Sequence, residues 1–167
     1  MLRYLLTGLA GATLALGLAV SAAAQVAIGF GGVAYDARQP VEVTADSLTI
    51  DQSTGEAVFS GNVIVHQGDL RMAAGQVRVL YSETDGRRAV DEVVASGGVL
   101  VTRGADAAEG RDARFDVASA LLTMAGGVLV TQGPTAVAGD RMVVNMRTGS
   151  GSVEGRVRTV LDTGDNE

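Results

Sequence analysis

The feature that most constrains the fold is a 22-residue unit that occurs three times without a gap, at 60–81, 96–117 and 125–146. A fixed register of this kind indicates one supersecondary unit that stacks on its own copies, because a single copy cannot bury its apolar face. We therefore expect the function to belong to the stack as a whole. Four positions hold the same residue in every copy: Gly61, Gly97 and Gly126; Val63, Val99 and Val128; Val65, Val101 and Val130; Gly68, Gly104 and Gly133.

The N-terminal segment, residues 1–24, has the pattern of a secretory signal peptide. Arg3 precedes a long apolar run, and Ala22 and Ala24 form a small-residue cleavage pattern. The apolar run is short for a membrane span of about 20 residues and is rich in Gly and Ala. We therefore predict cleavage after Ala24 and export across the membrane, with an uncleaved membrane anchor as the alternative.

The composition excludes several classes of function. The chain has 13 basic and 19 acidic residues and a net charge of -6, whereas a nucleic-acid partner demands a basic surface. Aromatic residues make up 4% of the chain, too few for platforms on which bases or sugars could stack. There is no cysteine, so neither a disulfide nor thiol chemistry is available. We therefore expect no nucleic-acid partner.

Turn residues recur about every 8 to 12 residues, which is typical of a sandwich, barrel or jelly roll. The segments between the turns are rich in Val, which favours strands. Gly61-Asn62 indicates a bulge or bend, and Asp85-Gly86 is a strong hairpin signal. The predicted strands are 41–50, 56–66, 70–74, 76–81, 89–101, 113–117, 121–131, 141–146 and 152–161.

The chain after the signal peptide has the length of a single domain. We place this domain at 40–161 and predict an all-β fold of repeated antiparallel hairpins. Residues 25–39 form a Gly-rich lead-in segment with little periodicity. Residues 162–167 are polar and are expected to form a flexible tail.

Alternation with period two separates an inner face from an outer face in each copy. The opposite face carries Ile64, Leu100 and Leu129, so these strands are apolar on both sides and their outer face is either covered or a docking surface. An ordinary dry core and a binding role are both open for any single inner position. The residues predicted inside the repeats are Val63, Val65, Val77, Val79, Tyr81, Val99, Val101, Ala113, Phe115, Val117, Val128, Val130, Met142, Val144 and Met146.

Residues that could carry chemistry are sparse. His66 is the only histidine, so it cannot build a zinc site, and it is predicted on an outer face, where it suits no catalytic triad. Asp106, Glu109 and Asp112 fall in one predicted loop and lack the repeat of calcium-binding β-rolls, so a solvated turn is the preferred interpretation. We expect no catalytic residue, no metal and no cofactor, and we predict that the protein is not an enzyme.

Segment 59–68, FSGNVIVHQG, follows the step Val43-Thr44-Ala45-Asp46. This combination resembles the OstA/LptA family of lipopolysaccharide transport proteins, and the resemblance covers about 39–161. Copy three departs from the pattern because it begins with Ala125 instead of Ser, and the chain has Arg or no basic residue where the family has Lys. The resemblance implies an open, twisted β-jelly roll with an apolar interior that holds the acyl chains of lipopolysaccharide.

The resemblance also implies a periplasmic bridge protein that carries lipopolysaccharide from the inner to the outer membrane for outer membrane assembly. The end strands 41–50 and 152–161 would join the inner-membrane and outer-membrane components of the machinery, or other copies head to tail. The alternatives are a membrane-anchored partner of the same pathway and a structural β-repeat protein without lipid cargo. The implied lipid-binding residues are Val41, Val43, Val63, Val65, Val77, Val79, Val99, Val101, Phe115, Val117, Val128, Val130, Met142 and Val144.

Overall fold

The computed structural model describes residues 39–84 and 86–161. The predicted signal peptide, nearly all of the lead-in segment and the predicted tail lie outside the described residues. The described part forms one 12-stranded antiparallel sheet, which confirms the all-β prediction. No helix in that part is long and apolar enough to cross a membrane.

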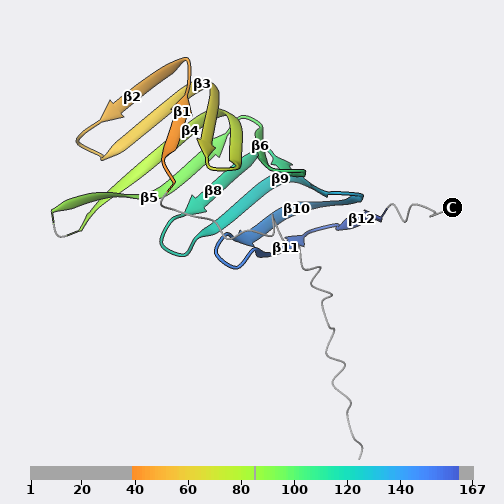
Figure 1. Ribbon diagram of the computed structural model, residues 1–167. Helices are drawn as coiled ribbons and strands as arrows, with labels where there is room; N and C mark the ends of the chain where they lie inside the picture. Colours follow the sequence, from red (N-terminus) through yellow and green to blue (C-terminus); the bar gives the residue numbers. More distant parts are fainter. Residues whose placement is uncertain (1–38, 85, 162–167) are drawn as a thin grey trace, which may run out of the picture.

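Some strands are long and bend in the middle, whereas others are short and occur in consecutive pairs (Figure 1). The two strands of a short pair together occupy the place of one bent strand. Each of them forms hydrogen bonds with one half of the same long neighbour, as β1 and β2 do with β3. The strands are β1 (Val41–Thr44), β2 (Ser47–Asp51), β3 (Glu56–Gln67), β4 (Leu70–Thr84), β5 (Arg87–Ser96), β6 (Val99–Arg103), β7 (Asp106–Gly110), β8 (Asp112–Asp116), β9 (Leu121–Gln132), β10 (Thr135–Asn145), β11 (Ser150–Glu154) and β12 (Arg158–Leu161).

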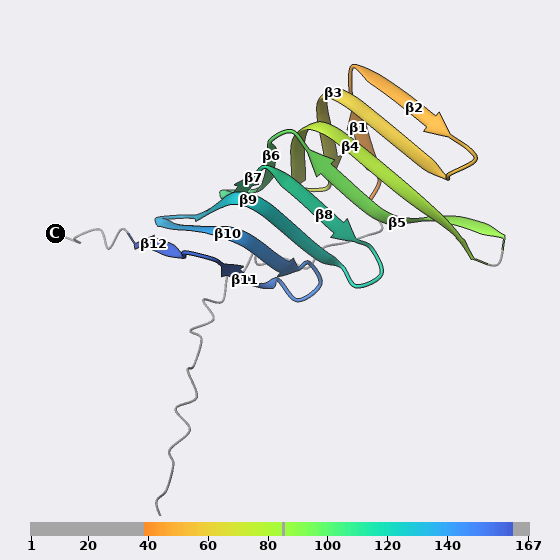
Figure 2. The same cartoon turned by 180° about the vertical axis from the view of Figure 1, so that it is seen from behind.

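The bends divide the sheet into two layers. Layer A contains β2, β5, β8 and β11, together with the first halves of β3 and β9 and the second halves of β4 and β10. Layer B contains β1, β6, β7 and β12, together with the remaining halves of the long strands. Figures 1 and 2 show the two layers diverging from the line of bends, with β1 and β2 at one end and β11 and β12 at the other. The result is an open β-jelly roll, as predicted.

Glycine pairs make the bends possible. Gly97-Gly98 and Gly126-Gly127 all have φ near +80°, between 80° and 87°, a region that residues with a Cβ rarely adopt. The pair from the first copy, Gly61-Asn62, also has positive φ, and the β3–β4 register shifts there. The predicted bulge is therefore confirmed.

Hydrogen bonds outside the regular ladders connect the bends of neighbouring strands. The Asp46 N–H donates to the Gly61 carbonyl at 2.9 Å, and the Arg111 N–H donates to the Ala125 carbonyl at the same distance. The Asn62 side-chain amide also donates to the Asp46 carboxylate at 2.8 Å. These contacts keep neighbouring bends aligned, so the two layers diverge along one common line.

Several predicted strand boundaries were wrong. The predicted strands 41–50 and 89–101 each break into two, because the chain turns from one layer to the other within them. The predicted segments 70–74 and 76–81 form one continuous strand, β4, since Gly75 bends the chain without ending it. The strand predicted at 141–146 begins earlier, at Thr135, and the sequence interpretation missed β7 entirely.

Substitution of the bend glycines tests this account. Gly127→Ala should cost about 1–2 kcal/mol, because φ is +80° but no atom lies within 4 Å of a new Cβ. Gly126→Ala should cost more, because its Cβ would also lie 2.6 Å from the Arg111 Cβ. Urea unfolding followed by circular dichroism measures both free energies. Equal losses for the two variants would contradict close packing at this bend.

Candidate functional site

The inner faces of the two layers carry matched rows of apolar side chains. The register aligns Val65 with Met72 and Val101 in layer B, and Val79 with Val93 in layer A. These rows continue across the remaining strands and pack into one hydrophobic cluster. The period-two alternation in the sequence therefore identified the inner face.

Most of the predicted interior residues belong to a closed core. Together with Met124, which is 0% exposed, they form one hydrophobic cluster of buried side chains. In this structure these residues form a dry core. The buried members of the predicted set are Val63, Val77, Val99, Val101, Val128, Val130, Met142 and Val144.

The other members of the predicted set that lie inside are partly buried and pack against the edge of that core: Val43, Val65, Val79 and Phe115. Met72 and Val93 have the same partial burial and belong to the same rows. These partly buried residues belong to β1, β3, β4 and β5, at the N-terminal end of the stack, and to β8. The apolar interior is therefore more accessible there than around β9 and β10, whose apolar inner side chains are buried.

Two predicted interior residues are exposed. Val41 shares the inner face with Val43 and Gln67 but is 57% exposed, because β1 is an end strand of the described sheet. Val117 is 36% exposed, because β8 ends at Asp116 and Val117 already belongs to the following turn. The predicted strand 113–117 therefore extended one residue too far, and Val117 does not continue the inner face of β8.

Apolar inner faces are also exposed at the two ends of the sheet. Leu48 and Ile50 of β2 share the inner face with Phe59 and Ala57, yet they are 51% and 60% exposed. At the opposite end Leu161 is 64% exposed. The sequence interpretation identified both segments as end strands, and it missed Leu48 and Ile50 as inner-face residues.

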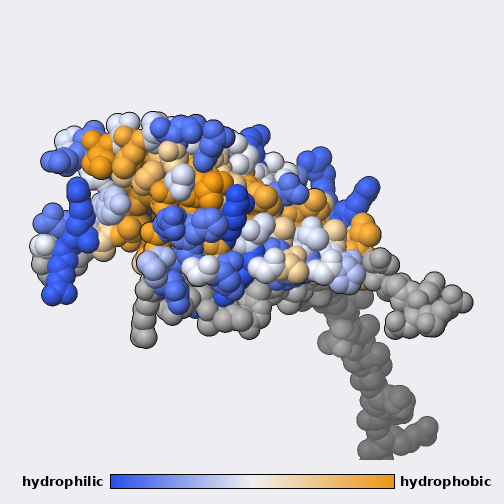
Figure 3. Space-filling model, turned by 45° about the horizontal axis from the view of Figure 1, so that its top comes forward, coloured by the Kyte–Doolittle hydropathy of each residue, from blue (hydrophilic) through white to orange (hydrophobic). Residues whose placement is uncertain are grey.

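A groove of about 720 Å³ lies on the outer side of layer B beside the bends. Ile64, Ala73, Leu100 and Leu129 line it, together with glycines of the bends. Figure 3 brings the top of the molecule forward and shows a band of apolar side chains bordered by hydrophilic ones. The prediction that these strand segments are apolar on both sides is therefore confirmed.

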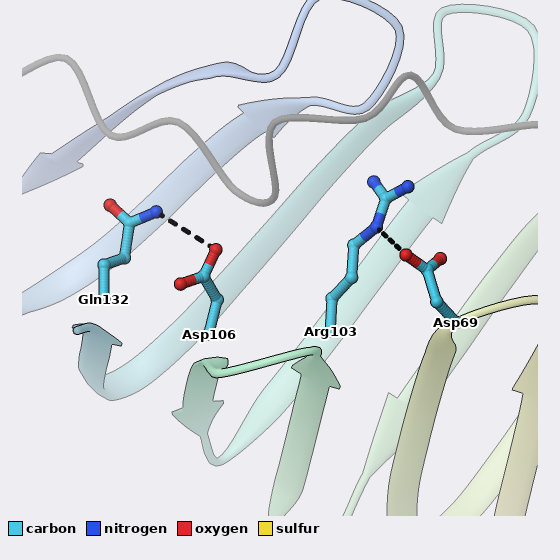
Figure 4. Close-up of polar contacts among 4 residues, drawn as sticks. All are labelled: Asp69, Arg103, Asp106 and Gln132. Atoms are coloured by element: carbon cyan, nitrogen blue, oxygen red, sulfur yellow. Dashed lines mark hydrogen bonds and ion pairs between the residues drawn. The ribbon is translucent and has the colours of Figure 1, made fainter.

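Polar side chains interrupt the inner face of layer B next to its hairpin turns (Figure 4). The Arg103 Nε donates to the Asp69 carboxylate at 2.9 Å, and the Arg103 side chain is 7% exposed. The Gln132 amide donates to the Asp106 carboxylate at the longer distance of 3.5 Å. The hydrogen bond from Arg103 holds the pKa of the Asp69 carboxyl below its usual value, so this carboxyl stays ionised beside the guanidinium.

The acidic residues considered as a calcium loop are placed differently from the prediction. Asp106 and Glu109 belong to β7 and Asp112 begins β8, because this segment pairs with β6 and β9. The described residues contain no group of three metal-ligating side chains. His66 is exposed on the outer face of β3, as predicted from the alternation.

An open β-jelly roll with an apolar interior defines the class of this protein. The chain belongs to the LptA/(LptD N-terminal domain) LPS transport protein family, whose model matches residues 42–150. This confirms the family resemblance identified from the segment 59–68.

Two relatives illustrate the similarity. An uncharacterized protein of Rhizobium meliloti (strain 1021), R00383, is 30% identical over an alignment of 133 positions that covers 74% of this chain and 72% of that protein. The crystal structure of LptH, described as the LptA homologous periplasmic component of the lipopolysaccharide transport device of Pseudomonas aeruginosa, matches with a TM-score of 0.65. That match covers 74% of this chain and 95% of LptH at 19% identity, so it is a likeness of fold.

The difference between the closed core and the open ends predicts unequal costs of truncation. Met142→Ala should destabilise the protein by about 2–5 kcal/mol, because Met142 is 0% exposed and its removal leaves a cavity. Ile50→Ala should cost less than about 1 kcal/mol, because Ile50 is 60% exposed. Urea unfolding of dilute protein measures both values. A loss at Ile50 as large as the loss at Met142 would contradict the open end.

Proposed function

We propose that this protein is a periplasmic lipopolysaccharide-binding bridge that carries lipopolysaccharide from the inner to the outer membrane for outer membrane assembly. The observation that carries the proposal is an apolar inner face that is buried at most positions but partly accessible at Val65, Met72, Val79 and Phe115 and exposed at both ends. A globular domain with no apolar cargo or partner gains nothing from leaving such a face open. The family membership supports the same function.

The acyl chains would lie along the partly buried inner side chains, and the sugars would stay in water. Each methylene removed from water contributes about 0.8 kcal/mol, so several acyl chains supply the affinity without polar contacts. Val65, Met72, Val79 and Phe115 are the residues proposed to touch them. The flexible Met72 side chain adapts to chains in different positions, which suits cargo that must move onward. The fully buried members of the predicted set would form the packed core beside this surface.

The two ends would form the contacts with partners. Strands β1 and β2 end the sheet on one side, and β11 and β12 end it on the other. Exposed strand edges pair readily with another chain, and pairing unlike ends produces an open filament. We propose that these edges bind the inner-membrane and outer-membrane components of the machinery and other copies head to tail. The inner face would then continue from one protein to the next.

The membrane-anchored partner of the same pathway remains the second candidate, because residues 1–24 fit a signal peptide or an anchor. The mass of the mature protein from the cell envelope distinguishes the two. A chain that begins after Ala24 supports the bridge, and an intact N-terminus supports the anchored partner.

Photo-crosslinking tests the cargo site. A crosslinking residue at Val65 or Phe115 should react with added lipopolysaccharide, because both side chains face the accessible interior. The matched control is Arg114, which precedes Phe115 in β8 and faces the opposite side of the layer. Folded protein that crosslinks equally at Phe115 and Arg114, or at neither, would favour a structural β-repeat without lipid cargo.

A charge at the β2 end tests head-to-tail association. Head-to-tail association predicts that the mass of the wild type, measured by light scattering, rises with concentration. Ile50→Glu should abolish this rise, because it places a carboxylate where the next copy would cover an apolar residue. Thr49→Glu is the matched control, since Thr49 lies on the outer face of the same strand. If the mass of both variants rises with concentration as in the wild type, association does not use this end.

A further inference from the structure

One copy of the repeat carries a cation at a position where the other copies carry an amide. Arg103 aligns with Gln67 and Gln132, and a glycine follows each of the three residues. Alternation places Arg103 on the same face as the buried Val99 and Val101, which is the inner face of layer B. The interior of this apolar sheet therefore contains a guanidinium that the repeat does not require.

Arg103 belongs to a row of inner side chains at the margin of layer B farthest from the bends. We call this row the layer-B lip; it comprises Gln67, Leu70, Arg103, Asp106, Gln132 and Thr135. The next row toward the bends is apolar: Val65 and Met72 are partly buried there, whereas Val101, Ala108 and Val130 are buried. A polar strip thus runs beside an apolar one, two residues away along each strand. Such a boundary matches an amphiphile, whose head lies at the polar strip and whose tails lie on the apolar one.

The local geometry prepares Arg103 for an anion. Its Nε donates to Asp69 at 2.9 Å, and this contact leaves the fork of the two terminal nitrogens outside the pair. Figure 4 shows those nitrogens pointing away from Asp69. The Asp69 side chain is 59% exposed in the turn after β3, so the charge that balances Arg103 sits at the surface and not beneath it. A fork of this kind binds phosphate oxygens in pairs.

We propose that Arg103 is a phosphate-binding residue at the layer-B lip and that it holds the phosphorylated head of a lipid whose acyl chains lie on Val65 and Met72, the partly buried members of the adjacent apolar row. This inference rests on the proposed function and adds to it the part of the cargo that is recognised. Asp69 acts as the competing anion: it neutralises the buried guanidinium in the lipid-free protein and yields to phosphate when lipid enters.

Binding of two lipids tests the proposal: lipid A with both phosphates, and the same lipid after enzymatic removal of the phosphates. The wild-type full-length mature chain should bind the phosphorylated form at least about tenfold more tightly, as expected for charge-assisted hydrogen bonds. Arg103→Gln should remove this preference, and its fold should survive, because Gln occupies the same position in the other copies. Asp69→Asn should strengthen binding of the phosphorylated form, because the competing carboxylate is gone.

Arg71→Gln is the matched control for charge, since Arg71 lies between Leu70 and Met72 on the opposite face of β4. It should leave the preference for the phosphorylated lipid intact. Equal binding of the two lipids by the wild type would overturn the inference while leaving the proposed function standing. An Arg103→Gln variant that loses affinity for both lipids equally would also overturn it, because that pattern marks a structural ion pair. Failure of the wild type to bind either lipid would overturn both proposals.

Discussion

The whole structure depends on the ability of each strand to bend sharply without leaving the sheet. Glycine pairs such as Gly97-Gly98 and Gly126-Gly127 adopt positive φ at this point, which a residue with a Cβ does only under strain. Because neighbouring strands bend at the same level, hydrogen bonding continues on both sides and one sheet becomes two layers. The repeat in the sequence reflects this bend, because every copy must provide it at the same position.

Folding a single sheet in this way produces an interior that is closed on one side only. Most inner residues, such as Val63 and Met142, are fully buried. Phe115 and Met72 are only partly covered, and the end strands leave Ile50 exposed. The same geometry therefore supplies both the stability of the protein, through its dry core, and the accessible apolar surface on which the proposed transport function depends.

The Val-rich segments between recurring turns predicted the all-β class, the alternation predicted the inner face, Gly61-Asn62 predicted the bend, and the family resemblance implied the open jelly roll. The sequence could not predict β7, because its residues, DAAEG, have little strand propensity and become a strand only by pairing with β6 and β9. Nor could it predict that Val41 would be exposed in an end strand or that β8 would end before Val117. The proposed role of Arg103 had two signals in the sequence: a departure from the Gln of the other copies, and an alternation that places it on the same face as Val99 and Val101. Only the structure shows its ion pair with Asp69 and its burial.

The proposed function requires that acyl chains lie on the accessible margin of the interior and not in the closed core. Methionine methyl groups report on both places, because Met72 is partly buried at the margin whereas Met142 is 0% exposed in the core. Nuclear magnetic resonance of methyl-labelled methionine, with lipid A added, is therefore the most direct measurement. The account predicts intermolecular contacts between acyl-chain protons and the Met72 methyl group, with none to Met142. Lipid binding without a contact at Met72 would contradict it.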